Sequence, residues 1–463
     1  DQLYRHLPVD QPRWTAATEA ARISEGMFGQ GIAVADANND GLDDVYVCNI
    51  GRNRLWLNCG DGTFLPADPL LPSEDVWTSS ALMVDLDLDG NVEIYDANYV
   101  SGEDVFTRLC PVGNKARSCS PLVFQPTPDR LWTGDGGQYR RIDMPSMVGN
   151  GLGCVAFALQ GNRVPSVFVS VDQQANLFGV VVQTADGWTL EDEAIVRGLA
   201  YDADGNAQAC MGIATADVND DGALDLYVTN FYLEYNTLYQ QTSFGFEDVT
   251  AVSGTAAATK PMLGFGTQFI DVQLDGIADL VVLNGHVDDH THMNVPEAMP
   301  PQLFLGRGGG RFDLVDGPQA GDFFASRRLG RALAKLDADG DGDEDLIAQD
   351  LENPVAIVEN QTPANRIPVR IELVGVDCDR NAFTAIATLE SGDYRQTQQL
   401  VAGGGYQAAN ERQLTFAVPR DSGPLTLTIH WPGGGSESYA ALHSGSKYIA
   451  IQGQGVHAVG TLR

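Results

Sequence analysis

The chain has 463 residues, of which 43% are apolar, and 28 basic against 62 acidic side chains give it a formal net charge of −34. Such an acidic surface disfavours binding to nucleic acid and to anionic membranes, because like charges repel. No run of about eighteen apolar residues exists, so the sequence predicts no membrane-spanning helix. The apolar content excludes a disordered chain.

The first expected strand lies around Trp14, ahead of a repeated part. The first repeat unit has an apolar strand that ends at Asp36 and an acidic loop that runs to Asp44. Two further strands follow, and the second of them ends in a glycine turn before Phe64. Short runs of β-branched and aromatic residues between turn residues predict antiparallel strands. Nothing in the chain has a convincing helical period, so we expect an all-β protein.

The acidic loop is a nine-residue pattern, Asp-x-(Asp/Asn/Gln)-x-Asp-Gly-x-x-(Asp/Glu), which occurs five times. Oxygen-bearing side chains at positions 1, 3, 5 and 9 and a free carbonyl at position 7 suit calcium, which takes roughly six to eight oxygen ligands. Glycine at position 6 permits the sharp turn around the ion. We therefore expect about five structural calcium ions. The predicted ligands are Asp36, Asn38, Asp40 and Asp44; Asp85, Asp87, Asp89 and Glu93; Asp217, Asn219, Asp221 and Asp225; Asp271, Gln273, Asp275 and Asp279; and Asp337, Asp339, Asp341 and Asp345.

A sixth, degraded copy lies between the second and third acidic loops, where Ala158, Gln160, Asn162 and Ser166 occupy the ligand positions. Six units of this length predict a β-propeller with six blades, and seven is the alternative if the long insertion contains another. The sixth unit lacks an outer strand. We expect the strand around Trp14 to complete it and close the ring. In the other units an aromatic residue starts the outer strand, at Phe64, Tyr139, Trp188, Phe246 and Phe312.

Two insertions, residues 101–128 and 287–300, follow the second strands of the second and fifth units, at the mouth opposite the acidic loops. In a six-unit ring these units face each other, so the insertions are expected to wall a ligand site there. The same strand ends carry polar residues, which either cap turns or form a polar collar around the mouth; turn caps are the simpler interpretation. These residues are Asn49, Asn98, Asn230, Asn284 and Asp350.

The second insertion has ligands for copper or zinc in His286, His290, His292 and Met293, although an ordinary polar surface loop explains them as well. For an enzyme that used the same mouth, the expected channel groups are His286, His290, Tyr99, Tyr232 and Arg331. The sequence has no G-x-S-x-G, P-loop, Rossmann or H-E-x-x-H motif.

Seven cysteines are too few for a scaffold built on disulfides. Cys110 and Cys119 lie in one Gly/Pro/Ser-rich segment and are expected to close a short loop; Cys48 with Cys59 is a second, less favoured pairing. The chain begins at Asp1 rather than Met, which suits a processed or a trimmed product. Calcium loops of low affinity and a disulfide both favour a secreted or periplasmic protein.

The repeated loops resemble FG-GAP/VCBS repeats, and the C-terminal region resembles the ASPIC/UnbV domain of the cartilage acidic protein family. The residues that carry the second resemblance are Gly403-Gly404-Gly405-Tyr406-Gln407, Leu414-Thr415-Phe416 and His430-Trp431-Pro432-Gly433-Gly434. The resemblance implies a calcium-loop propeller over residues 1–362 and a small β-sandwich over residues 363–463. Phe383-Thr384-Ala385 departs from the Gly-Ala-Arg of the family. The family has no general reaction, so the resemblance implies no substrate.

These features favour a monomeric module that binds a protein or glycan at the mouth opposite the calcium loops. The alternative is a lyase or isomerase that acts on a sugar or a secondary metabolite at the same mouth. A copper or zinc carrier is the third hypothesis.

Overall fold

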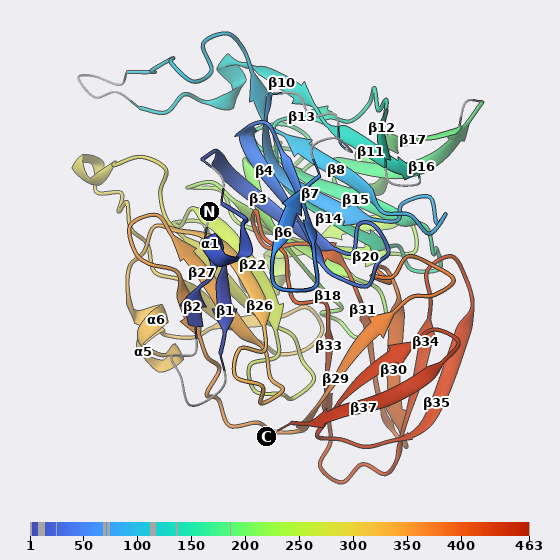
Figure 1. Ribbon diagram of the computed structural model, residues 1–463. Helices are drawn as coiled ribbons and strands as arrows, with labels where there is room; N and C mark the ends of the chain where they lie inside the picture. Colours follow the sequence, from blue (N-terminus) through green and yellow to red (C-terminus); the bar gives the residue numbers. More distant parts are fainter. Residues whose placement is uncertain are drawn as a thin grey trace.

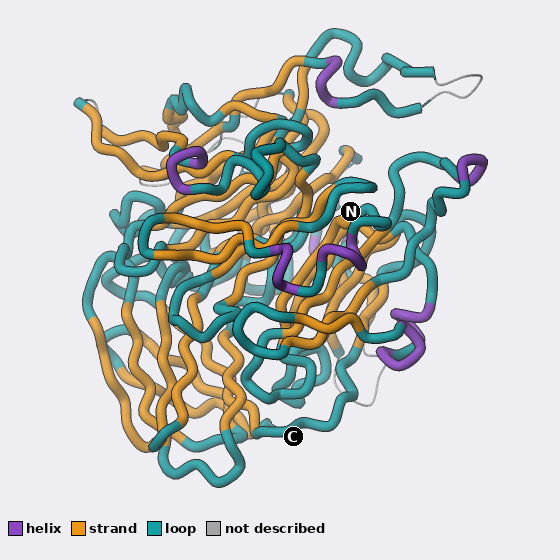
Figure 2. Tube along the Cα trace, turned by 180° about the vertical axis from the view of Figure 1, so that it is seen from behind, coloured by secondary structure: helices purple, strands orange, loops and turns teal. Residues whose placement is uncertain are grey.

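The computed structural model describes residues 2–7, 14–24, 26–67, 71, 75–111, 117–135, 138–185 and 187–462. The chain is all-β, with only single-turn helices (Figures 1 and 2). It has two parts. Residues 28–358, here called the propeller-like part, form successive antiparallel units, and residues 367–461, here called the C-terminal part, form two further sheets. No helix among the described residues has the length and apolar character needed to cross a membrane.

The propeller-like part follows the repeats of the sequence. Each acidic loop joins the first and second strands of a unit, and the first strands pack side by side: β7 against β3 and β14, and β22 against β18 and β26. The six units consist of β3 (Phe28–Ala35), β4 (Asp44–Gly51), β5 (Arg54–Asn58) and β6 (Phe64–Pro66); β7 (Val76–Val84), β8 (Glu93–Asn98), β11 (Arg130–Asp135) and β12 (Gln138–Ile142); β14 (Gly151–Ala158), β15 (Pro165–Val171), β16 (Leu177–Thr184) and β17 (Gly187–Asp192); β18 (Cys210–Ala216), β19 (Asp225–Asn230), β20 (Thr237–Thr242) and β21 (Gly245–Asp248); β22 (Gly264–Ile270), β23 (Asp279–Asn284), β24 (Gln302–Gly306) and β25 (Phe312–Leu314); and β26 (Gly330–Leu336), β27 (Asp345–Asp350) and β28 (Ala356–Val358).

Short elements connect these units. The strands among them are β1 (Tyr4–His6), β2 (Trp14–Ala16), β9 (Val100–Ser101), β10 (Gln125–Pro128) and β13 (Val148–Gly149). The helices are α1 (Thr18–Ala21), α2 (Ala194–Arg197), α3 (Thr250–Ser253), α4 (Ala256–Thr259), α5 (Gly317–Ala320), α6 (Asp322–Ala325) and the 3₁₀ turns η1 (Pro121–Val123) and η2 (Thr291–Met293).

The prediction that the strand around Trp14 completes the sixth unit is wrong for the described residues. Strand β2 pairs with β1, where Trp14 lies opposite His6 with their rings 4.9 Å apart. The segment that follows packs Ala21 and Ile23 against Trp56 of the first unit. The N-terminal strand therefore finds its hydrogen-bond partner locally, and β28 is the last strand of the described sixth sheet.

The C-terminal part contains two four-stranded sheets whose buried side chains belong to one hydrophobic core. One sheet has the order β33-β29-β36-β37 and the other β31-β30-β34-β35. The strands are β29 (Ile367–Val374), β30 (Ile386–Ser391), β31 (Tyr394–Gln399), β33 (Leu414–Val418), β34 (Leu425–His430), β35 (Ser436–Leu442), β36 (Ser446–Ile451) and β37 (Gly455–Thr461). The short strand β32 (Ala402–Gly403) leaves these sheets and pairs with β14 of the propeller-like part.

Candidate functional site

The acidic loops repeat one hydrogen-bond pattern. In the first loop, one carboxylate oxygen of Asp36 accepts from the N–H of Asp40 at 3.0 Å and the other accepts from Gly41 at 2.7 Å. Asp44 closes the loop by accepting from the N–H of Ala37 at 3.0 Å. The bond from the glycine recurs at Asp85, Asp217 and Asp271, and the closing bond recurs at Glu93, Asp225, Asp279 and Asp345.

The backbone of every loop enters the left-handed region twice. The sixth residue is always glycine, with φ between 83° and 99°. An L side chain adopts this conformation rarely, which explains why glycine recurs at that position. The fourth residue has φ between 47° and 80°, at Asn39, Leu88, Asp220, Leu274 and Gly340.

In two loops the acidic side chains converge closely enough for one cation. Three residues each place one oxygen within 4.8 Å of the others, and burial raises the pKa of Asp85 to about 7 and that of Glu93 to about 9. Carboxylates this close repel each other unless protons or a cation neutralise them, and a donor set made only of oxygen fits calcium. The two groups are Asp85, Asp87 and Glu93, and Asp337, Asp339 and Asp345.

The C-terminal part packs against the end of the units that carries the acidic loops. Asn381 accepts from the N–H of Asp36 at 2.7 Å, and Arg412 pairs with Asp43 at 2.7 Å. Arg370, whose side chain is 3% exposed, pairs with Asp337 at 3.2 Å. The two insertions lie on the other side of the molecule (Figure 1). The mouth between the insertions therefore lies on the side away from the acidic loops.

At this mouth the side chains predicted for a channel lie together. The His286 ring lies 5.6 Å from that of Phe231 and 5.9 Å from that of Tyr232. Arg331 of β26 donates to the carbonyl of His286 at 3.2 Å. Tyr99, Phe231 and Tyr232 pack on one apolar cluster and remain partly exposed. Phe231, which the sequence did not predict, lies with them. The name mouth site is used here for Tyr99, Phe231, Tyr232, His286 and Arg331.

The electrostatics of His286 make it a hydrogen-bond donor. Burial, with the neighbouring His290, lowers its pKa to about 4, so the ring is neutral at pH 7. Its Nδ1 accepts from the N–H of Asp288 at 3.1 Å. The proton of the neutral ring is therefore on Nε2, which leaves Nε2–H to donate and no lone pair for general-base chemistry.

Tyr99 and Asp172 form the acidic side of the mouth. The hydroxyl of Tyr99 donates to Asp172 Oδ2 at 2.7 Å. Burial raises the pKa of Asp172 to about 6, and the hydrogen bond from Tyr99 limits that rise. Asp172 thus presents an acceptor next to the aromatic rings.

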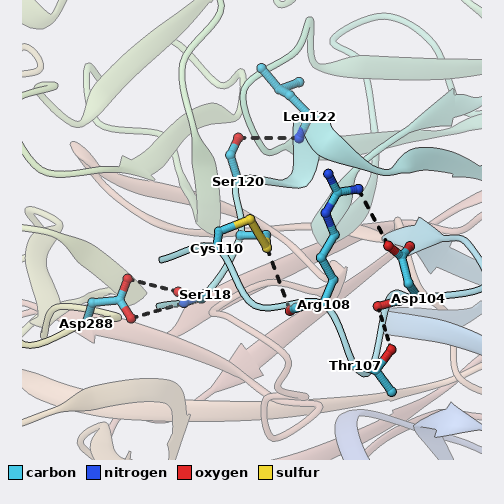
Figure 3. Close-up of a disulfide and its surroundings, with 9 residues drawn as sticks. Asp104, Thr107, Arg108, Cys110, Ser118, Ser120, Leu122 and Asp288 are labelled. Carbon is cyan, nitrogen blue, oxygen red and sulfur yellow. Dashed lines mark hydrogen bonds and ion pairs between the residues drawn. A yellow bond between two sulfur atoms is a disulfide. The ribbon is translucent and has the colours of Figure 1, made fainter. Parts of the chain in front are cut away.

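The two insertions contact each other on the side of the mouth. The Arg117 guanidinium lies 2.6 Å from Nδ1 of His290 and donates to the carbonyl of Asp289 at 3.2 Å. The hydroxyl of Ser118 donates to Asp288 at 3.0 Å, as Figure 3 shows. The first insertion is thereby fixed over the second.

The predicted disulfide between Cys110 and Cys119 is formed, with Cα atoms 5.1 Å apart (Figure 3). The less favoured pairing is not formed: Cys48 is buried and Cys59 exposed, and both are free thiols. The register of β4 with β5 pairs Val47 with Arg54, which places the two cysteines at opposite ends of that hairpin.

The histidine loop brings together only some of the predicted copper or zinc ligands. The rings of His286 and His290 lie 4.5 Å apart, and that of His292 lies 6.3 Å from His290. Met293 is 56% exposed. The Arg117 cation beside both ring nitrogens of His290 competes for the lone pair that a metal would need.

Of the five polar residues at the ends of the second strands, Asn49, Asn230 and Asp350 cap turns. Asn98 and Asn284 instead donate to the carbonyls of Pro128 and Pro300, at the far ends of the two insertions. Asn230, for example, donates to the carbonyl of Tyr235 at 2.7 Å, and Asp350 accepts from the N–H groups of Glu352 and Asn353. All five are buried. They stabilise the rim, and Tyr99, Phe231 and His286 of the mouth follow three of them in the chain.

Sequence reasoning missed four residues of this region: Phe231, Asp172, Arg117 and Tyr406. The first two directly follow the second strands of their units, as Tyr99 does, so their position was a usable signal. Tyr406 comes from the C-terminal part, and nothing in the repeat predicts its place.

Comparison with known proteins supports the architecture. A model of the FG-GAP-like repeat matches residues 36–95, and a model of the ASPIC and UnbV domain matches residues 375–456. No curated protein sequence matches the chain. A solved lectin from Agrocybe aegerita, described as recognising non-reducing terminal N-acetylglucosamine, is 14% identical over 74% of this chain and 84% of its own, with a TM-score of 0.42.

Two further solved structures are comparably distant. Aleuria aurantia lectin in complex with α-methyl-L-fucoside is 10% identical over 73% of this chain and 98% of its own, with a TM-score of 0.34. The exotype rhamnogalacturonan lyase YesX is 12% identical over 94% of this chain and 73% of its own, with a TM-score of 0.38. Likenesses this weak assign no function. The two matching models establish that the chain combines an FG-GAP-like repeat with a C-terminal ASPIC/UnbV domain, as its motifs predict.

Proposed function

We propose that this protein is a secreted or periplasmic, calcium-stabilised binding module that holds a glycan at the mouth site. The observation that carries the proposal is the convergence of partly exposed Tyr99, Phe231 and Tyr232 with the donor His286 and the acceptor Asp172. Aromatic faces with a few placed polar groups are what a specific small-ligand site requires.

The chemistry of this set suits a saccharide. A pyranose ring has an apolar C–H face that packs on an aromatic ring, and hydroxyl groups around its edge that need donors and acceptors. Arg331 already donates to the backbone carbonyls of Gly285, Gly330 and His286. Its guanidinium therefore stabilises the protein backbone. A neutral sugar therefore fits better than an anionic one.

The frame under this proposal is a six-bladed propeller followed by a β-sandwich, with the boundary near residue 362. About five calcium ions would bind at the acidic loops, through the ligands predicted there. When bound, calcium neutralises the clustered carboxylates and ties the first strand of each unit to the second. The ions would lie at the end opposite the mouth and would act on stability.

An enzyme at the same mouth is the second candidate, favoured by the Tyr99–Asp172 pair. Asp172, with its pKa raised to about 6, can exchange a proton near neutral pH. A lyase or isomerase would additionally need a base, and Nδ1 of His286 is occupied by the N–H of Asp288. Binding is therefore the better supported function.

The test is a screen of immobilised neutral oligosaccharides, with hits checked by titration calorimetry in 1 mM calcium. We expect saturable binding that Tyr232→Ala weakens about tenfold, the loss of one stacking contact. Phe244→Ala is the matched control, because Phe244 is an aromatic side chain, 90% exposed, in the outer hairpin of the fourth unit. Absence of any saturable binding, or equal effects of both variants, contradicts the proposal. Turnover of a bound oligosaccharide would establish the enzyme instead.

A further inference from the structure

The segment 402–407 leaves the C-terminal part and enters the centre of the propeller-like part. Strand β32 pairs Ala402 with Ala156 and Gly403 with Val155. Two residues further on, Gly405 exchanges two backbone hydrogen bonds with Ile213 of β18, at 2.7 and 2.6 Å. The segment is therefore bound to the first strands of the third and fourth units.

The glycines of this segment are required by its surroundings. A Cβ on Gly403 would lie 2.5 Å from the side chain of Leu82 in β7 and 2.6 Å from the carbonyl of Cys154 in β14. A Cβ on Gly405 would lie 2.3 Å from the carbonyl of Leu333 in β26 and 2.8 Å from the side chain of Gln268 in β22. Gly403 thus lies against β7 and β14, and Gly405 lies against β18, β22 and β26. Because these are the first strands of five units, the segment lies where those units meet.

Tyr406 follows on the side of the mouth. Its ring lies 5.1 Å from that of Phe265, over which Arg331 stacks at 4.0 Å, and it belongs to the apolar cluster on which Tyr99 and Tyr232 pack. It is 7% exposed. Its hydroxyl has no hydrogen-bond partner within the described residues and is not among their fully buried unpaired polar atoms. Arg331 and Asp172 of the mouth act electrostatically on this hydroxyl.

We infer that the C-terminal domain completes the glycan site: Tyr406 forms the floor of the mouth and its hydroxyl binds a hydroxyl group of the sugar. This inference rests on the proposed function. Under this inference both parts of the chain contribute residues to the ligand site. The C-terminal domain then serves recognition through one loop, although its sheets lie at the far end of the propeller-like part.

Tyr406→Phe tests this inference, because it removes the hydroxyl and keeps the ring that packs on Phe265. The probes are neutral methyl pyranosides titrated into the full chain by saturation-transfer NMR in 1 mM calcium. We expect Kd to rise about fivefold, the loss of one neutral hydrogen bond. Tyr439→Phe in β35 is the matched control; it removes a phenol that bonds Glu437 within the C-terminal part, and its Kd should equal that of wild type.

The outcomes separate the two proposals. If wild type binds and Tyr232→Ala weakens binding while Tyr406→Phe leaves Kd unchanged, the glycan site stands and the role of Tyr406 is wrong. If wild type binds no glycoside, the proposed function fails first. The placement of the loop is then tested by Gly405→Ala. This variant should speed amide hydrogen exchange over residues 402–407 and leave β29 and β30 protected. Unchanged exchange in that variant would overturn the placement.

Discussion

Arg117 and His290 are 173 positions apart in the sequence, yet the guanidinium of one lies 2.6 Å from Nδ1 of the other. The contact joins the two insertions over the mouth site. On one side it depends on the loop closed by Cys110 and Cys119, which contains Arg117.

Removal of the disulfide should therefore loosen the first insertion without unfolding the protein. Closing a loop of this length is worth about 2–3 kcal/mol in the unfolded state. The insertion contributes little to the core, since Phe106, Leu109 and Leu122 are largely exposed. Cys110→Ser with Cys119→Ser should make residues 105–111 and 117–124 sensitive to limited proteolysis while the strands of the six units stay protected. Cys59→Ser, which removes an exposed free thiol, is the control; an equal cleavage rate in both proteins would contradict the prediction.

Calcium should stabilise the whole chain in proportion to the number of intact loops. At about 1 mM calcium, a site with a Kd of about 0.1 mM contributes about 1.4 kcal/mol, so five sites give about 7 kcal/mol. Chelation should lower Tm sharply, and elemental analysis after refilling should give about five ions per chain. Asp85→Asn should remove about one ion, whereas Asp61→Asn, in a turn outside the loops, should remove none. A Tm that does not respond to chelation would refute structural calcium.

The stability contributed by His286 should depend on pH in a defined direction. Its folded pKa is lowered to about 4, below the value near 6.5 of an unfolded histidine. The contribution is complete above about pH 6.5 and is lost as pH falls toward 4, because only the unfolded chain takes up the proton. Urea unfolding at pH 7 and 4.5 should show wild type losing up to about 3 kcal/mol more than His286→Gln. Equal losses in the two proteins would mean that His286 titrates normally in the fold.

Local patterns predicted more of this protein than long-range ones. The acidic loops, the aromatic starts of the outer strands and the Cys110–Cys119 loop all depend on residues close in sequence. The mouth residues Tyr99 and His286 were predictable because they follow second strands of a regular repeat. The seating of Tyr406 was not, because it depends on how two parts of the chain dock. The same reason explains the error at Trp14, whose strand had a nearer partner in β1 than in the distant sixth unit.

Docking of the C-terminal part should be coupled to calcium through Arg370. This arginine is buried and pairs with Asp337 at 3.2 Å and with Glu411 at 2.6 Å. In chelator, Arg370→Met leaves these carboxylates without their cation and should cost about 3 kcal/mol of unfolding free energy. Calcium at the fifth loop neutralises Asp337 by itself, so the cost in saturating calcium should be smaller, and that loop should bind calcium more tightly than in wild type.

Arg412→Met is the matched variant for this prediction. Arg412 also joins the C-terminal part to an acidic loop, but its partner Asp43 is outside the predicted ligand set and its carboxylate is 50% exposed. Its cost should be below about 1 kcal/mol and equal with and without calcium. Thermal unfolding of both variants, in calcium and in chelator, measures how the stability cost of each substitution depends on calcium. A penalty for Arg370→Met that calcium leaves unchanged would show that Arg370 and the ion do not share Asp337.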